Sequence, residues 1–251
     1  MSLPEYFCWT RFGTEAGQTV AEIIDRKEQE RIANDGVFLW GIGNPVGPSI
    51  RELVRLVCDP DVLFSPTRSR ARPEDEFPAS VVAWSSAETL TGRSYSVPPC
   101  SLVTSGYNPG ISRDAHYALV CYSSRPLKFR KTKDRLVVTN IRNILSGRPV
   151  GASQVTSVVK LVPSAPKGMA LYEVPLRAKL AEPYVIRLQK PLPLWKKGSG
   201  HQLTAAVRRI WESLRAGDRP DFGHLVEKSA RHTKFHAPSE TVEFRHSRLR
   251  N

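Results

Sequence analysis

A glycine-rich loop, GIGNPVGP at residues 41–48, contains the first residues whose types and spacing suggest chemistry. We expect a helix to begin at Ser49, with Glu52 three residues later completing a capping box. Free amide groups at a helix start attract phosphate, and glycine lets a backbone approach a ligand closely. The glycines concerned are Gly41, Gly43 and Gly47. The spacing matches neither G-x-G-x-x-G nor a P-loop, so a tight strand-to-helix turn is the competing interpretation.

A second candidate is a basic run that contains only one acidic residue, Asp134. A cation that meets a phosphate releases a condensed counterion, so such a run predicts salt-sensitive binding to a polyanion without sequence preference. A solvated basic face is the alternative. The run consists of Arg125, Lys128, Arg130, Lys131, Lys133, Arg135, Arg142, Arg148 and Lys160.

Aromatic residues near the ends of expected strands form the third candidate. Their rings can stack on an unpaired or flipped base, each stack contributing about 1–3 kcal/mol, and they are also common core residues. We expect Trp40 and Trp84 to line a pocket. The whole set is Trp9, Trp40, Trp84, Tyr95, Tyr107, Tyr117 and Tyr122.

Histidine, cysteine and carboxylate residues show no arrangement that predicts a catalytic, metal or cofactor site. His232, His236 and His246 lie close in sequence without completing a ligand set. The four cysteines lack a C-x-x-C pair, and the apolar runs around Cys8 and Cys121 indicate reduced, buried thiols. A reducing cytoplasm fits this usage.

Charge is distributed unevenly along the 251 residues, which carry a net charge of +13. Residues 1–100 contain 10 basic and 14 acidic side chains, whereas residues 101–251 contain 27 and 10. This asymmetry predicts a polyanionic partner, nucleic acid first among them. No apolar stretch of about 18 residues and no signal-like N-terminus is present, so we expect neither a membrane partner nor secretion.

Periodicity and turn residues predict the order of elements. We expect helices from the N-cap Thr19 to Ala33 and from Ser49, a loop over 85–115, and an amphipathic helix near 203–214. A proline-containing stretch near 163–168 suggests a nucleic-acid-binding domain at 1–165 and a basic α/β extension at 166–251. The expected strands are 6–9, 37–42, 62–65, 80–84, 116–122, 135–138, 156–162, 171–174 and 184–188.

Residues 5–162 resemble the PUA-like superfamily, which includes the EVE, YTH, ASCH and SRA-type domains. The resemblance lies in YFCW (6–9), DGVFLWGIGN (35–44), DVLFS (61–65) and VVAWSSAE (81–88). It implies an α+β fold, a small curved mixed β-barrel flanked by helices. It also implies a modified or flipped base held by Trp40, Trp84 and either Tyr95 or Tyr107, with phosphates contacting residues 125–148.

Three functions follow as hypotheses. The first is a module that binds modified, flipped or single-stranded nucleic acid. The second is an enzyme that holds phosphate with the Gly41–Ser49 loop, and the third is a protein that docks on a ribonucleoprotein through its basic C-terminal half. The choice between DNA and RNA, and the oligomeric state, stay open.

Overall fold

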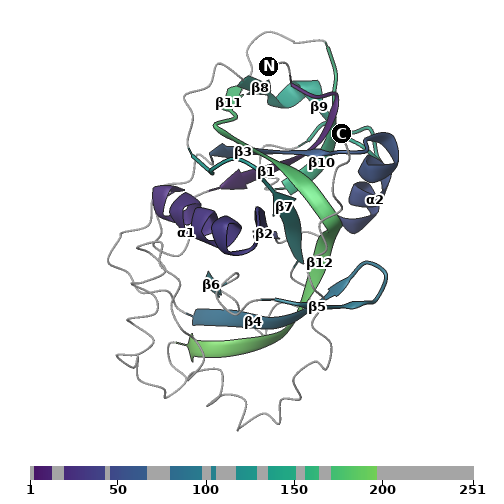
Figure 1. The fold of residues 1–251 in the computed structure, drawn as a ribbon. Coiled ribbons are helices and arrows are strands. Elements are labelled where there is room, and N and C mark those ends of the chain that lie inside the picture. The colour runs from purple at the N-terminus through teal and green to yellow at the C-terminus, as the bar shows by residue number, and fades with distance from the viewer. Residues whose placement is uncertain are drawn as a thin grey trace.

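The computed structural model describes residues 3–12, 20–42, 46–66, 80–97, 103–105, 117–128, 135–150, 156–163 and 171–196. These residues form a mixed α+β fold in which two α-helices accompany a large sheet (Figure 1). The α+β class predicted from the sequence is therefore confirmed. The predicted helix near 203–214 lies outside the described residues.

The elements follow one another in a fixed order along the chain. They are β1 (Tyr6–Phe12), α1 (Val20–Ala33), β2 (Val37–Ile42), α2 (Gly47–Leu56), β3 (Asp61–Pro66), β4 (Ser80–Thr89), β5 (Ser94–Ser96), β6 (Val103–Ser105), β7 (Tyr117–Tyr122), β8 (Arg135–Val137), the 3-10 turn η1 (Val138–Asn140), β9 (Ile141–Asn143), β10 (Thr156–Leu161), β11 (Leu171–Glu173) and β12 (Leu176–Lys196).

Ten of the strands form one sheet. Seven of them follow one another in the order β2-β7-β12-β3-β1-β10-β9, and β4, β5 and β6 branch from this path. Strand β4 pairs with β12 and carries β5 and β6, while β11 and β8 form a separate two-stranded sheet. Strands β1 and β3 run parallel, with Trp9 opposite Leu63 and Arg11 opposite Ser65. The carboxyl ends of these two strands therefore lie side by side.

The described strands do not close into the predicted barrel. Strands β2 and β9 stand at the two ends of the strand order and do not pair with each other. Closure depends on whether the outermost strands meet, and no local pattern in the sequence encodes that pairing. Within the described residues the sheet is open, and the barrel prediction is wrong there.

Strand β12 joins the two parts of the sheet (Figure 1). Its first part pairs with β3 and β7, and its register to β7 shifts between Leu180 and Val185. Its second part pairs with β4, from Ile186 opposite Thr89 onward. Strands from both sides of the predicted boundary near residue 165 therefore belong to one sheet. The sequence predicts only the fragment 184–188 because prolines interrupt the alternating pattern of β12.

The region predicted as a loop at 85–115 contains strand structure. Strand β4 continues to Thr89, and the short strands β5 and β6 both pair with it. Three-residue strands that contain serine, such as SYS and VTS, carry too little alternation to be recognised from the sequence.

Helix α1 ends as predicted at the turn Asn34-Asp35-Gly36, where Gly36 has a φ of 95° and its amide donates to the Arg31 carbonyl at 2.8 Å. The start of α2 differs from the prediction. Its N-cap is Val46, and Ser49 lies inside the first turn without a capping bond. Pro48 occupies the helix start, where its fixed φ favours helix and its missing amide hydrogen is no loss.

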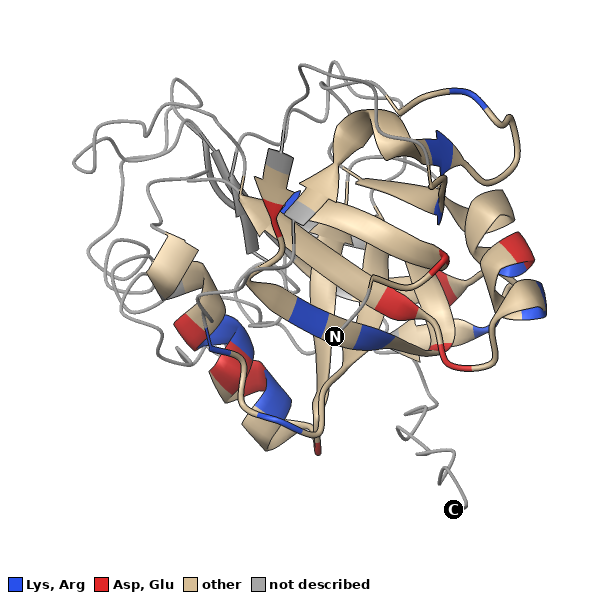
Figure 2. Ribbon diagram, turned by 90° about the horizontal axis from the view of Figure 1, so that it is seen from above, with Lys and Arg blue, Asp and Glu red and all other residues tan. Residues whose placement is uncertain are grey.

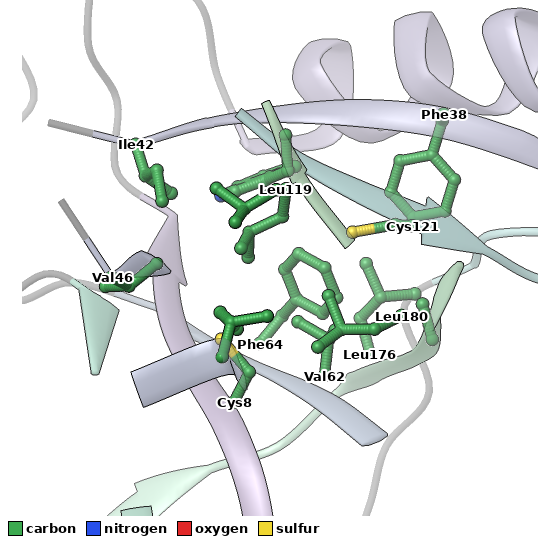
Figure 3. Close-up of a cluster of buried hydrophobic side chains, with 14 of the residues drawn as sticks. Cys8, Phe38, Ile42, Val46, Val62, Phe64, Leu119, Cys121, Leu176 and Leu180 are labelled. Carbon is green, nitrogen blue, oxygen red and sulfur yellow. The ribbon is translucent and has the colours of Figure 1, made fainter. Parts of the chain in front are cut away.

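The main hydrophobic cluster contains residues of the sheet and of both helices, and Figure 3 shows part of it. Cys8 and Cys121 are free and buried in it, as predicted. Beneath α1, Lys27 and Glu30 form a buried ion pair at 2.7 Å, and Glu30 also accepts the Leu39 amide at 2.8 Å. These bonds fix α1 on β2 although the helix has a narrow apolar face.

Candidate nucleic-acid interface and a buried guanidinium

Four of the aromatic residues predicted to hold a base are core residues. Trp84 is 2% exposed, and Trp9, Trp40 and Tyr95 are likewise buried. The Trp40 ring packs edge-on against Phe64 with 4.9 Å between ring centroids. A base could stack on these rings only if the surrounding strands moved apart. Tyr107, the other predicted pocket residue, lies outside the described residues.

The glycine-rich loop is explained by packing as far as it is described. A Cβ at Gly47 would lie 2.9 Å from Cδ2 of Leu90, so a larger residue would displace that side chain. Ser49 is buried in α2, and Gly41 is an exposed residue of β2. Gly43 lies outside the described residues. These contacts favour the competing interpretation, a tight turn that needs glycine.

The segment after β7 holds two exposed cations, Arg125 and Lys128. Between them Leu127 is buried, and its amide donates to Oε2 of Glu28 on α1 at 2.7 Å. The Ser123 hydroxyl donates to the Arg125 carbonyl at 2.7 Å. This buried anchor therefore holds both cations at the surface beside α1.

A third exposed cation, Arg148, lies in the turn after β9. Oδ1 of Asn143 organises this turn by accepting the amides of Leu145 at 3.0 Å and Ser146 at 2.9 Å. The side chain of Arg142 is held against the backbone, because its Nη1 donates to the Thr139 carbonyl at 2.5 Å. The side chains of Arg130, Lys131, Lys133 and Arg135 lie outside the described part of the structure.

Other cations of the latter part of the chain meet acidic residues of the first part. Lys160 lies 3.5 Å from Glu5, and Lys179 bridges Asp59 at 2.9 Å and Asp61 at 3.2 Å. Helices α1 and α2 each carry both basic and acidic residues (Figure 2). We use the name "exposed basic set" for Arg125, Lys128 and Arg148, which form no salt bridge with any carboxylate of the described ranges.

Arg11 on β1 is a charged residue of the interior that the sequence analysis missed. It is 9% exposed, and its guanidinium carbon lies 4.6 Å from the Trp9 ring centre and 4.7 Å from that of Tyr172. Its Nε and Nη2 are buried and have no hydrogen-bond partner among the described residues. The sequence does contain a signal for this burial. Phe7, Trp9 and Arg11 are spaced two residues apart, so they share one face of the strand, and the first two of these three residues are apolar.

Ser65 on β3 lies next to this guanidinium in the strand register. It is buried, and its Oγ accepts the indole N–H of Trp9 at 3.0 Å. Burial lowers the pKa of Arg11, and Tyr172 partly offsets that shift. The arrangement therefore has several hydrogen-bond donors around one buried positive charge.

Metal-binding and membrane-spanning features are not found in the described ranges. No group of three or more histidine, cysteine, aspartate or glutamate residues there could hold a metal ion. Neither α1 nor α2 has the length and apolar character needed to cross a bilayer.

Comparison with known proteins leaves the PUA-like resemblance as a prediction. No family model, curated protein or solved structure gives a significant match to the chain.

Proposed function

We propose that the protein binds the phosphate backbone of nucleic acid through the exposed basic set and the basic residues between its members. The supporting observation is that Arg125, Lys128 and Arg148 stand at the surface and form no salt bridge with a carboxylate of the described residues, whereas Lys160 and Lys179 are engaged by acidic residues. We limit the proposal to backbone contact, because Trp9, Trp40, Trp84 and Tyr95, which were expected to read a base, are buried.

The physical signature of such binding is its dependence on salt. Each phosphate neutralised on a duplex contributes about −0.9 to the slope of log K against log salt concentration. Removal of Arg125 and Lys128 therefore reduces the magnitude of that slope by about 2 and weakens binding to all sequences alike.

The test is a titration of labelled duplex DNA, single-stranded DNA and RNA at several KCl concentrations. The wild type is compared with the double variant Arg125→Gln/Lys128→Gln. Arg55→Gln is the matched control, because Arg55 is an exposed arginine already paired with Glu52 at 3.0 Å. We expect the control to behave as the wild type.

Two results would overturn the proposal. One is the absence of binding to any of the three nucleic acids at low salt. The other is an unchanged salt slope in the double variant, which would show that these cations do not meet phosphate.

A further inference from the structure

We propose that Arg11 and Ser65 provide the donors of a binding site for a single phosphate group, enclosed by the rings of Trp9 and Tyr172. The site lies where the parallel strands β1 and β3 end, at Phe12 and Pro66. It shares no residue with the exposed basic set, and it does not depend on the function proposed above.

The first step is the missing counter-charge of Arg11. A buried guanidinium is strongly unfavourable unless it is paired and hydrogen-bonded. The two aromatic rings, at 4.6 and 4.7 Å, offset only part of that penalty. No described residue accepts a hydrogen bond from Nε or Nη2. An anion is therefore the group that this environment lacks.

The second step is the geometry of the free donors. Nε and Nη2 form one edge of the guanidinium plane, and their parallel N–H groups match two oxygens of a phosphate. The Ser65 hydroxyl accepts the Trp9 indole N–H at 3.0 Å, so its own hydrogen is left to donate. Arg11 and Ser65 are partners in the strand register and point to the same face. Three donors, with no carboxylate of the described residues in a salt bridge to Arg11, favour an oxyanion over a cation.

The third step is the position of the site in the sheet. Arg11 and Ser65 are each the penultimate residue of their strand. A phosphate can reach them through adjustments at the strand ends, without separation of the core strands.

The test uses the full chain and inorganic phosphate as the probe. Calorimetric titration with potassium phosphate is compared with potassium chloride at equal ionic strength, in the wild type, Arg11→Lys and Arg11→Met. We expect both variants to weaken phosphate binding by about tenfold or more, because lysine keeps the charge but lacks the paired N–H edge. Arg125→Gln/Lys128→Gln should bind inorganic phosphate as the wild type does.

A second measurement separates a ligand site from a structural arginine. Thermal unfolding without phosphate should show Arg11→Met at least as stable as the wild type, since methionine removes an unpaired buried charge and fills similar space. A marked loss of stability would mean that Arg11 has an internal partner, and would overturn the proposal. Unchanged phosphate binding in Arg11→Lys would do the same, even if Arg11→Met failed to fold.

The source of the phosphate is resolved by two further probes. A short oligonucleotide with a 5′-phosphate offers a monoester, and the same oligonucleotide without it offers only backbone diesters. Loss of affinity for both in Arg11→Lys assigns the backbone, and loss confined to the phosphorylated probe assigns a terminal or free monoester. If neither probe depends on Arg11 and inorganic phosphate does not bind, the site does not exist.

Discussion

Glu28 shows how a single carboxylate connects distant parts of the chain. Its Oε2 accepts Nε of Arg31 at 2.7 Å and the amide of Leu127 at 2.7 Å, and Oε1 accepts Nη2 of Arg31 at 2.8 Å. The side chain is 17% exposed, so water screens these bonds only in part. The hydrogen bond from Arg31 is the main reason that the pKa of Glu28 lies below its ordinary value of 4.5.

We predict that Glu28→Gln lowers the free energy of unfolding at neutral pH by about 1.5–3 kcal/mol, the range for hydrogen bonds to a charged group. The folded pKa is lowered, so the stabilisation is complete above the ordinary value of 4.5 and is lost as pH falls through the folded value. The wild type and variant should therefore converge in acid. Urea unfolding followed by tryptophan fluorescence at neutral and acidic pH measures this.

The control for this prediction is Glu52→Gln. Glu52 pairs with Arg55, whose side chain is 78% exposed, and such surface pairs contribute about 0–1 kcal/mol. A loss equal to that of Glu28→Gln, or a Glu28→Gln effect that persists in acid, would contradict the assigned role.

Arg11 illustrates what residue-level reasoning can and cannot extract from this sequence. Its place on the apolar face follows from alternation with Phe7 and Trp9. Its contact with Tyr172 does not, because β11 lies far along the chain and reaches this site only through the fold. Burial of Trp40 and Trp84 has the same cause, since an aromatic ring near a glycine-rich turn is compatible with either a pocket or a core.

At the scale of elements, periodicity identified the regular parts of the fold. Strands β2 and β7 are continuous apolar runs, and helix α1 is bounded by the turn Asn34-Asp35-Gly36; all three lie close to their predicted bounds. The sequence predicts only residues 184–188 of strand β12, because Pro183, Pro191 and Pro193 lie within the strand. Proline weakens a ladder locally, but pairing with three other strands overrides that local preference.

We predict that a chain ending at residue 165 does not fold. It lacks β12, and therefore β3, β4 and β7 each lose one of their partner strands. Circular dichroism should show loss of the β-sheet signal, and thermal denaturation should show no cooperative transition. A chain ending at Lys196 retains every described strand and should unfold cooperatively; a folded, monomeric 1–165 chain would contradict the assignment of β12 to the sheet.

At the scale of the whole molecule, the cysteines test whether the sheet behaves as one unit. Cys8 on β1 and Cys121 on β7 lie on opposite sides of β12 and β3 in the strand order, yet belong to one hydrophobic cluster. Burial raises the pKa of Cys8 to about 12 and also raises that of Cys121. Both thiols are therefore unreactive in the folded state, because the thiolate is the nucleophile.

We predict that iodoacetamide modifies Cys58, which is exposed, while Cys8 and Cys121 stay protected until the sheet opens. Peptide mass spectrometry over a series of urea concentrations assigns each modification to its cysteine. Both buried thiols should lose protection at the same urea concentration, because β12 and β3 join their strands into one cooperative sheet. Loss at two different concentrations would show that the two sides of β12 unfold separately, in which case the sheet contains two cooperative units joined at that strand.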